Sequence, residues 1–255
     1  MKKRAVLSVL DDSPALVQTL GSDLSRMGLA VAGHLWSDDM QNHAWSEAAR
    51  ELMHSDTCLW VIAGSRQKFA EKAVRQGLAL AALAAQSEHG HNFAILLSPS
   101  AGELDVASLP TPLRGAECVL KNIAGKAAVL ASKRTGHARA EYRLIPRALP
   151  GLGLWFELGP VDTPWKGAFL AASGNSPDVQ GVGPAGTIPS NCTLHYPVQG
   201  LKLALGEQEF TGNGVHNEIV PGNAYYARLI ATPDTIMFGP FPDTDDAELY
   251  TVSLC

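Results

Sequence analysis

Two adjacent carboxylates, Asp11 and Asp12, directly follow the first apolar stretch of this 255-residue chain, residues 5–10. A close acidic pair can hold Mg²⁺ or act as acid and base, because two neighbouring carboxylates push their pKa values apart. The apolar stretch predicts the first strand of a parallel α/β sheet, and sites in such sheets are built at the carboxyl ends of the strands. Asp11 and Asp12 are therefore candidate cofactor-binding residues. The alternative is that one of them caps the helix that follows and complements its dipole.

The elements that would position this pair alternate along the first half of the chain. Ser13 is placed to cap a helix with Pro14 at its first position, and Gly28 is placed to end it. The stretch 58–63 is apolar on both faces, as in a central parallel strand covered by helices. Apolar periodicity predicts further helices near 45–53, 68–86 and 125–133, and strands at 5–10, 29–32, 58–63, 93–97 and 116–120. Five strands that alternate with helices predict a doubly wound, flavodoxin-like α/β sheet.

The second half of the chain differs from the first in proline content and in apolar periodicity. Twelve of the 16 prolines follow Arg134, and no helical period there exceeds a turn or two. The expected strands lie at 153–158, 167–172, 201–205, 225–231, 235–238 and 248–253, and their spacing predicts an antiparallel β-sandwich or barrel. Residues 173–190 are expected to form a long loop. We therefore predict an α/β domain at 1–134 and a β domain at 141–255.

Charge and apolar pattern narrow the classes of partner. The net charge of −5 argues against a broad nucleic-acid surface, which needs clustered basic residues. No apolar run approaches the ~18 residues that a membrane span needs. Of the four cysteines, Cys58 and Cys118 fall within apolar strands, and none forms a metal-like pair. These features predict a cytoplasmic protein without a nucleic-acid or membrane partner.

The stretch at residues 10–14, with the helix that follows it, resembles the start of response-regulator receiver domains. The likeness continues at 115–121, where Lys121 stands for the lysine that this family keeps after its last strand. Ser98 stands for the family's hydroxyl residue. The third strand ends at Ser65, where receiver domains have a phosphorylatable aspartate. The resemblance implies a receiver-like fold without the phosphoryl acceptor.

Four stretches of residues 5–123 are similar to Toll/interleukin-receptor (TIR) domains, which share this topology: 45–47, 52–56, 58–65 and 109–113. In enzymatic members of this family, a glutamate on the helix after the third strand supports cleavage of NAD at its glycosidic bond. By this resemblance Glu71 is the candidate catalytic residue. The candidate cofactor-binding residues, for NAD or Mg²⁺, are Asp11, Asp12 and Ser65.

The position of Glu71 relative to the third strand leaves its role open. It follows Ser65 by six residues, earlier than the TIR family places its glutamate, and Gln76 stands nearer the expected position. The alternative for Glu71 is an ion pair with Arg75, four residues further along a solvated helix face.

Two other groups of polar residues contain side chains that could form a site. Residues 88–91 offer two imidazoles and a carboxylate to a transition metal, but a polar surface turn is expected there and no metal site is predicted. In the β half, Ser173 and Asp178 could join His195 or His216 in a nucleophilic arrangement, although no nucleophile-elbow pattern accompanies them.

Two features of the β half bear on ligands. The acidic stretch 243–246 with Glu248 could hold Ca²⁺, or it could be a solvated hairpin. The β half holds most of the aromatic residues, and most of these are expected in its core. Any that are exposed beside the 173–190 loop would mark a partner site. The residues are Trp155, Phe156, Trp165, Phe169, Tyr225 and Tyr226.

The sequence favours an intracellular signalling or docking protein. Its TIR- or receiver-like domain would be non-catalytic and need no cofactor, and its β domain would bind a protein partner or a small ligand. A homo-oligomer is also compatible with the pattern. Two alternatives stay open: a TIR-like NAD hydrolase regulated by the β domain, and a lectin-like protein that binds glycans or peptides.

Overall fold

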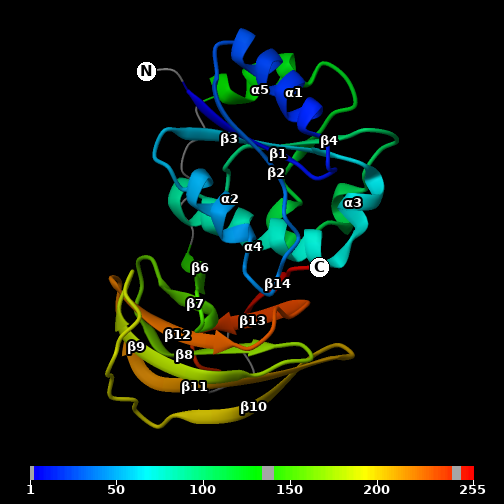
Figure 1. Ribbon diagram of the computed structural model, residues 1–255. Coiled ribbons are helices and arrows are strands. Elements are labelled where there is room, and N and C mark those ends of the chain that lie inside the picture. The colour runs from blue at the N-terminus through cyan, green and yellow to red at the C-terminus, as the bar shows by residue number, and fades with distance from the viewer. Residues whose placement is uncertain (1–2, 134–140, 243–247) are drawn as a thin grey trace. The chain divides into compact units, whose positions relative to one another are not determined.

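A computed structural model describes residues 3–133, 141–242 and 248–255 (Figure 1). The chain divides into two compact units, Met1–Arg139 and Ala140–Cys255. None of the helices in these described ranges is both long and apolar enough to cross a membrane.

The first unit is built on a five-stranded sheet in which every pairing is parallel, in the order β2-β1-β3-β4-β5. Its strands are β1 (Arg4–Val9), β2 (Ala30–Leu35), β3 (Thr57–Gly64), β4 (Ile95–Pro99) and β5 (Glu117–Cys118). Its helices are α1 (Pro14–Arg26), α2 (Trp45–Leu52), α3 (Arg66–Ala70), α4 (Lys72–His89) and α5 (Ile123–Ser132), with 3₁₀ turns η1 (Val106–Ser108) and η2 (Thr111–Leu113). The strand order is that of a flavodoxin-like sheet, so the predicted fold class is confirmed.

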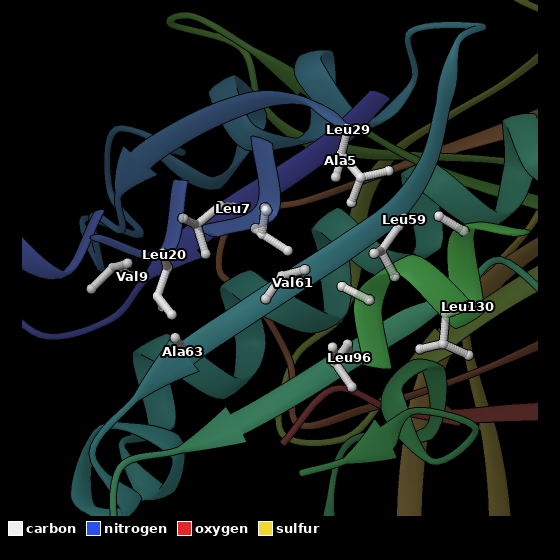
Figure 2. Packing of buried hydrophobic residues seen from close by; sticks show 13 residues of the cluster. Ala5, Leu7, Val9, Leu20, Leu29, Leu59, Val61, Ala63, Leu96 and Leu130 are labelled. Carbon is white, nitrogen blue, oxygen red and sulfur yellow. The ribbon is translucent and has the colours of Figure 1, made fainter. Parts of the chain in front are cut away.

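Helices cover both faces of this sheet. Alternate residues of β1 and β3 point to one face, where they pack against α1 and α5 (Figure 2). The residues labelled there are Ala5, Leu7, Val9, Leu20, Leu29, Leu59, Val61, Ala63, Leu96 and Leu130. Helices α2 and α4 lie on the other face (Figure 1). Helix α4 is buried from Leu78 to Ala85. Each fully buried leucine adds about 2 kcal/mol to the hydrophobic stabilisation.

Three boundaries in this unit differ from the sequence prediction. Strand β2 runs three residues beyond the predicted 29–32, because it is an edge strand in which Gly33 and His34 interrupt the apolar pattern. The predicted helix at 68–86 is two helices, since Glu71 has an extended backbone between them. Strand β5 has two residues in place of the predicted 116–120, and Leu120 beyond it is exposed.

The second unit contains two antiparallel sheets, ordered β10-β11-β8-β13-β14 and β6-β7-β12-β9. The strands are β6 (Tyr142–Leu149), β7 (Gly153–Pro160), β8 (Trp165–Ala172), β9 (Pro177–Pro184), β10 (Val198–Leu205), β11 (Gln208–Ile219), β12 (Asn223–Leu229), β13 (Thr235–Gly239) and β14 (Tyr250–Ser253). Side chains join the two sheets: the rings of Tyr142 and Phe238 meet edge to face at 5.0 Å, and the Asn213 amide donates to the Pro177 carbonyl at 2.9 Å. The predicted β-sandwich class is confirmed.

Strands β6, β9 and β11 were not predicted, and the expectation of a continuous loop at 173–190 is wrong because β9 lies within it. The glycines of β9 and β11 look like turn residues in the sequence, but they are sites of close packing. A Cβ at Gly183 would lie 3.0 Å from the Pro189 ring, and one at Gly214 would lie 2.8 Å from the Phe241 ring. Glycine is used in these strands because neighbouring groups leave no space for a side chain.

Candidate functional site

The switch point of the first unit's sheet lies between β1 and β3, because the chain leaves these neighbouring strands in opposite directions. Asp11 follows the end of β1 and Ser65 follows the end of β3. The backbone N–H of Leu10 donates to the Ala63 carbonyl at 2.8 Å and holds the two strand ends together. The fold therefore brings two of the three predicted cofactor-binding residues to one point.

Asp11 and Ser65 bind each other directly. The backbone N–H of Ser65 donates to Asp11 Oδ2 at 2.6 Å, and the Ser65 hydroxyl donates to Asp11 Oδ1 at 2.7 Å. The same hydroxyl accepts the backbone N–H of Lys68 at 3.3 Å and so caps α3. Hydrogen bonds to a carboxylate are among the stronger ones in proteins. Each Asp11 oxygen thus has a donor supplied by the protein itself.

Asp12 is placed differently. It is exposed and forms no hydrogen bond or ion pair with any residue that the structure describes. The cap of α1 is Ser13, whose side chain accepts the backbone N–H of Leu16 at 3.3 Å. The alternative that Asp11 or Asp12 caps this helix is therefore wrong, because Ser13 holds the capping position.

Glu71, the candidate catalytic residue, lies between α3 and α4 and is about one-third exposed. Its carboxylate accepts a hydrogen bond from Lys68 Nζ at 2.8 Å. This bond, with the nearby Asp38, raises the pKa of Lys68. The alternative pairing with Arg75 is wrong, since the Arg75 guanidinium donates to the Ser108 carbonyl at 2.5 Å.

Neither Ser98 nor Lys121, the residues matched to the receiver family, forms a hydrogen bond or ion pair with Asp11 in the described part of the chain. Ser98 lies within β4, opposite Ala63, and is buried. Lys121 is exposed and has no ion pair with a described residue. Ser65, which the resemblance aligns with the phosphorylatable aspartate of receiver domains, donates two hydrogen bonds to Asp11.

A second polar group in this unit was not predicted from the sequence. Ser8, His34 and Trp60 lie on three neighbouring strands and face α2. The Trp60 indole N–H donates to Ser8 Oγ at 2.9 Å, and Ser8 Oγ lies 2.9 Å from His34 Nε2. The indole can only donate and takes one lone pair of Ser8 Oγ, so the Ser8 hydroxyl proton is free to be donated to His34 Nε2 of a neutral imidazole. Burial also lowers the pKa of His34. A serine inside an apolar strand is the one signal in the sequence for this group.

Two clefts flank the edge strand β2. One, of about 690 Å³, lies beside α1, and the other, of about 360 Å³, lies beside α2. Gly33 lines both. The first is lined by Val17, Gln18, Gly21, Ser22, Ser25, Arg26, Val31 and Gly33. The second is lined by residues 32–37 with Ala44, Glu47, Ala48, Arg50 and Glu51.

The candidate metal and nucleophile groupings are not assembled. His89 Nε2 is 2.8 Å from the Leu52 carbonyl, and its ring stacks on Phe93. In the β unit, Asp178 is bound by both arms of Arg228, at 2.7 and 2.9 Å, and the Ser173 hydroxyl accepts the Thr235 N–H. No group of three or more His, Cys, Asp or Glu among the described residues is placed to hold a metal ion. The acidic stretch 243–246 lies outside the described residues.

The aromatic residues of the β unit are core residues, as expected. All six of the aromatic residues expected in this core are buried: Trp155, Phe156, Trp165, Phe169, Tyr225 and Tyr226. One exposed aromatic residue was not singled out: Tyr196, 82% exposed, whose ring meets His216 edge-on at 6.1 Å. His216 also contacts Phe241.

No family model and no curated protein matches this chain. Among solved structures, a 3-dehydroquinate dehydratase-like protein from Bifidobacterium longum matches 52% of this chain and 100% of its own, with 17% sequence identity and a TM-score of 0.34. At this level the likeness supports no functional conclusion.

Proposed function

We propose that this chain is a signalling or docking protein: a non-catalytic TIR- or receiver-like α/β unit joined to a β-sandwich unit that binds a protein partner or a small ligand. The observation that carries the proposal is the pairing of Asp11 with Ser65 at the switch point. A working receiver needs a free carboxylate there to hold Mg²⁺ and a second one to accept phosphate. A TIR-type hydrolase needs a glutamate free to face the nucleotide.

The local geometry argues against both chemistries. The Asp11 oxygens already accept two hydrogen bonds from Ser65, which fix the carboxylate on the protein's own donors and leave it fewer lone pairs for a cation. The Glu71 carboxylate is bound to Lys68, on the helix turn before it. A unit whose acidic groups are bound in this way is expected to act by binding other molecules through its surface.

The proposal is tested by incubating the purified full-length protein with NAD, and separately with acetyl phosphate and Mg²⁺. Nicotinamide release is followed by chromatography and covalent phosphate by intact mass. We expect neither product above the level of the Glu71→Gln and Asp11→Asn variants. Turnover that either substitution abolishes would overturn the non-catalytic assignment.

The binding role of the β unit needs its own measurement. A thermal-shift screen of the full chain with nucleotides, sugars and divalent ions reports any ligand that prefers the folded state, because such binding raises the melting temperature. We expect a positive ligand to act on the transition of the β unit, followed by the tyrosine signal, since all five tyrosines of the chain belong to this unit. A ligand effect that Asp11→Asn removes would place binding in the α/β unit instead.

A further inference from the structure

Strand β2 presents an open hydrogen-bonding edge. Among the described residues it pairs with β1 alone. The backbone N–H groups of Ala30 and Trp36 donate to β1, so the even-numbered residues of β2 face that strand. In a parallel ladder the odd-numbered residues then direct both N–H and C=O away from it. Val31, Gly33 and Leu35 therefore present unpaired backbone groups along the edge.

This edge lacks three features by which proteins commonly protect an open strand. Strand β2 contains no proline and no lysine, and its ladder to β1 has no bulge. Protected edges carry such features because an unpaired strand is a template for another strand. Leu35, on the open edge, is an exposed apolar residue. The edge has the character of a pairing surface.

The two faces beside the edge have room for a further strand. Odd-numbered side chains of β2 face α1, and even-numbered ones face α2. The cleft on each side would receive alternate side chains of an added strand. Along α1 this space is bordered by small residues, Gly21, Ser22 and Ser25, which permit close approach.

The charges beside the edge point to a second copy of the chain as the occupant. Glu47 and Arg50 both line the cleft at α2, one helical turn apart. Neither forms an ion pair within the described part of the chain. Around a two-fold axis, Glu47 of one copy would face the partner's Arg50 and Arg50 would face the partner's Glu47. Opposite charges at this spacing are self-complementary, as an isologous interface requires.

We propose that two copies of this chain pair antiparallel through β2, with Gly33 on the two-fold axis. Val31 then lies opposite the partner's Leu35, and each outward residue exchanges two hydrogen bonds with its counterpart. The two sheets become one continuous sheet across the axis, and the Val31–Leu35 contacts cover the exposed leucine. This inference does not depend on whether the switch point is catalytic.

The test is the mass of the full-length protein by sedimentation equilibrium over a wide range of concentration. We expect the wild type to dimerise. Leu35→Lys introduces a charge at the edge and is expected to weaken the dimer at least about tenfold. Its matched control is Leu205→Lys, at an even more exposed leucine on the edge strand β10 of the other unit, which should leave the dimer intact. Circular dichroism verifies the fold of each variant.

Charge reversal tests the two-fold arrangement itself. Glu47→Arg and Arg50→Glu each place like charges across the axis and should each weaken dimerisation about tenfold. The double variant restores opposite charges and should recover most of the affinity. Both residues are exposed, so these variants are expected to fold. A monomer at every concentration would overturn the proposal. A dimer that Leu205→Lys weakens, or one that the double variant does not recover, would overturn it equally.

Discussion

Ser65 donates to both oxygens of the Asp11 carboxylate, one through its backbone N–H and one through its hydroxyl. The two residues are 54 positions apart in the chain. Their contact joins the end of β1 to the first turn of α3 across the switch point of the sheet. In related folds this point holds a ligand; here the protein's own groups bind one another.

Replacing Ser65 by alanine is expected to destabilise the α/β unit by about 1–2 kcal/mol. The change removes the hydroxyl donor to Asp11 and the side-chain cap of α3 together. Urea denaturation followed by circular dichroism measures the loss. Ser13→Ala is the matched control, since it removes the cap of α1 alone and should cost about 1 kcal/mol. Equal stability of Ser65→Ala and wild type would contradict the importance of the Asp11 contact.

Replacing Ser65 by aspartate is expected to create a divalent-cation site. The substitution puts a second carboxylate beside Asp11, and two close carboxylates repel unless one is protonated or a cation lies between them. The variant should be less stable than wild type at neutral pH, and Mg²⁺ should raise its melting temperature while leaving that of the wild type unchanged.

The uncharged Ser65→Asn variant separates this effect from a change of shape. It should show no response to Mg²⁺. If Mg²⁺ stabilises the asparagine and aspartate variants equally, the cation binds elsewhere.

Replacing Ser8 by alanine should cost about 1–3 kcal/mol. The Trp60 indole N–H would lose its acceptor in a fully buried position, and a buried unpaired donor carries its whole desolvation penalty. A double-mutant cycle with Trp60→Phe isolates this contact, because the donor is then absent. We expect Ser8→Ala to cost less in the Trp60→Phe background. Strict additivity would show that the hydrogen bond contributes nothing.

The stability of the α/β unit should fall as the pH drops below about 6.5. Burial holds the pKa of His34 below its ordinary value of 6.5, and the nearby Glu47 and Glu51 offset this in part. The unfolded chain therefore takes up a proton before the folded chain does, and stability is lost until the pH reaches the folded-state pKa. Well above pH 6.5, where His34 is neutral in both states, the residue makes no contribution to the slope.

His34→Gln should flatten this pH dependence when denaturation is compared at about pH 7.5 and about pH 5.5. Part of the slope will persist, because burial lowers the pKa of His43 and His91 in the same direction. An unchanged slope would mean that His34 titrates alike in both states.

In the β unit, Arg147→Met should destabilise by about 3–5 kcal/mol. Glu157 is 1% exposed, and its carboxylate is bound by Arg147 at 2.7 Å and by the Gly186 N–H at 3.0 Å. Removal of the guanidinium leaves a buried carboxylate with one donor. Chemical denaturation of the single variant and of Arg147→Met with Glu157→Gln tests this. The double variant should recover much of the loss, and a failure to do so would indicate a packing defect rather than an unpaired charge.

Elements set by local contacts could be predicted in detail. Helix α1 begins and ends where its sequence signals place it, because Ser13, Pro14 and Gly28 act within a turn of the helix they bound. Apolar runs such as 58–63 identify central strands for a similar reason, since a strand covered on both faces is apolar throughout.

Elements set by distant neighbours could not be predicted. Strands β9 and β11 contain glycines that are required because Pro189 and Phe241 pack closely against them. The sequence of each strand alone does not predict these contacts. The role of Glu71 was open for the same reason: the expected pairing with Arg75 assumed one continuous helix, whereas the backbone at Glu71 is extended and its carboxylate binds Lys68.

By itself the sequence determined the two classes of fold, the central strands and the residues at the strand ends, Asp11 and Ser65 among them, because periodicity and capping act over a few residues. Tertiary structure decided which of those residues meet. Parallel pairing of β1 with β3 turned two separate candidates into one hydrogen-bonded pair, and the placement of β2 at the sheet edge left its outward backbone groups open. Both outcomes depend on strand order, which arises from packing of the whole sheet.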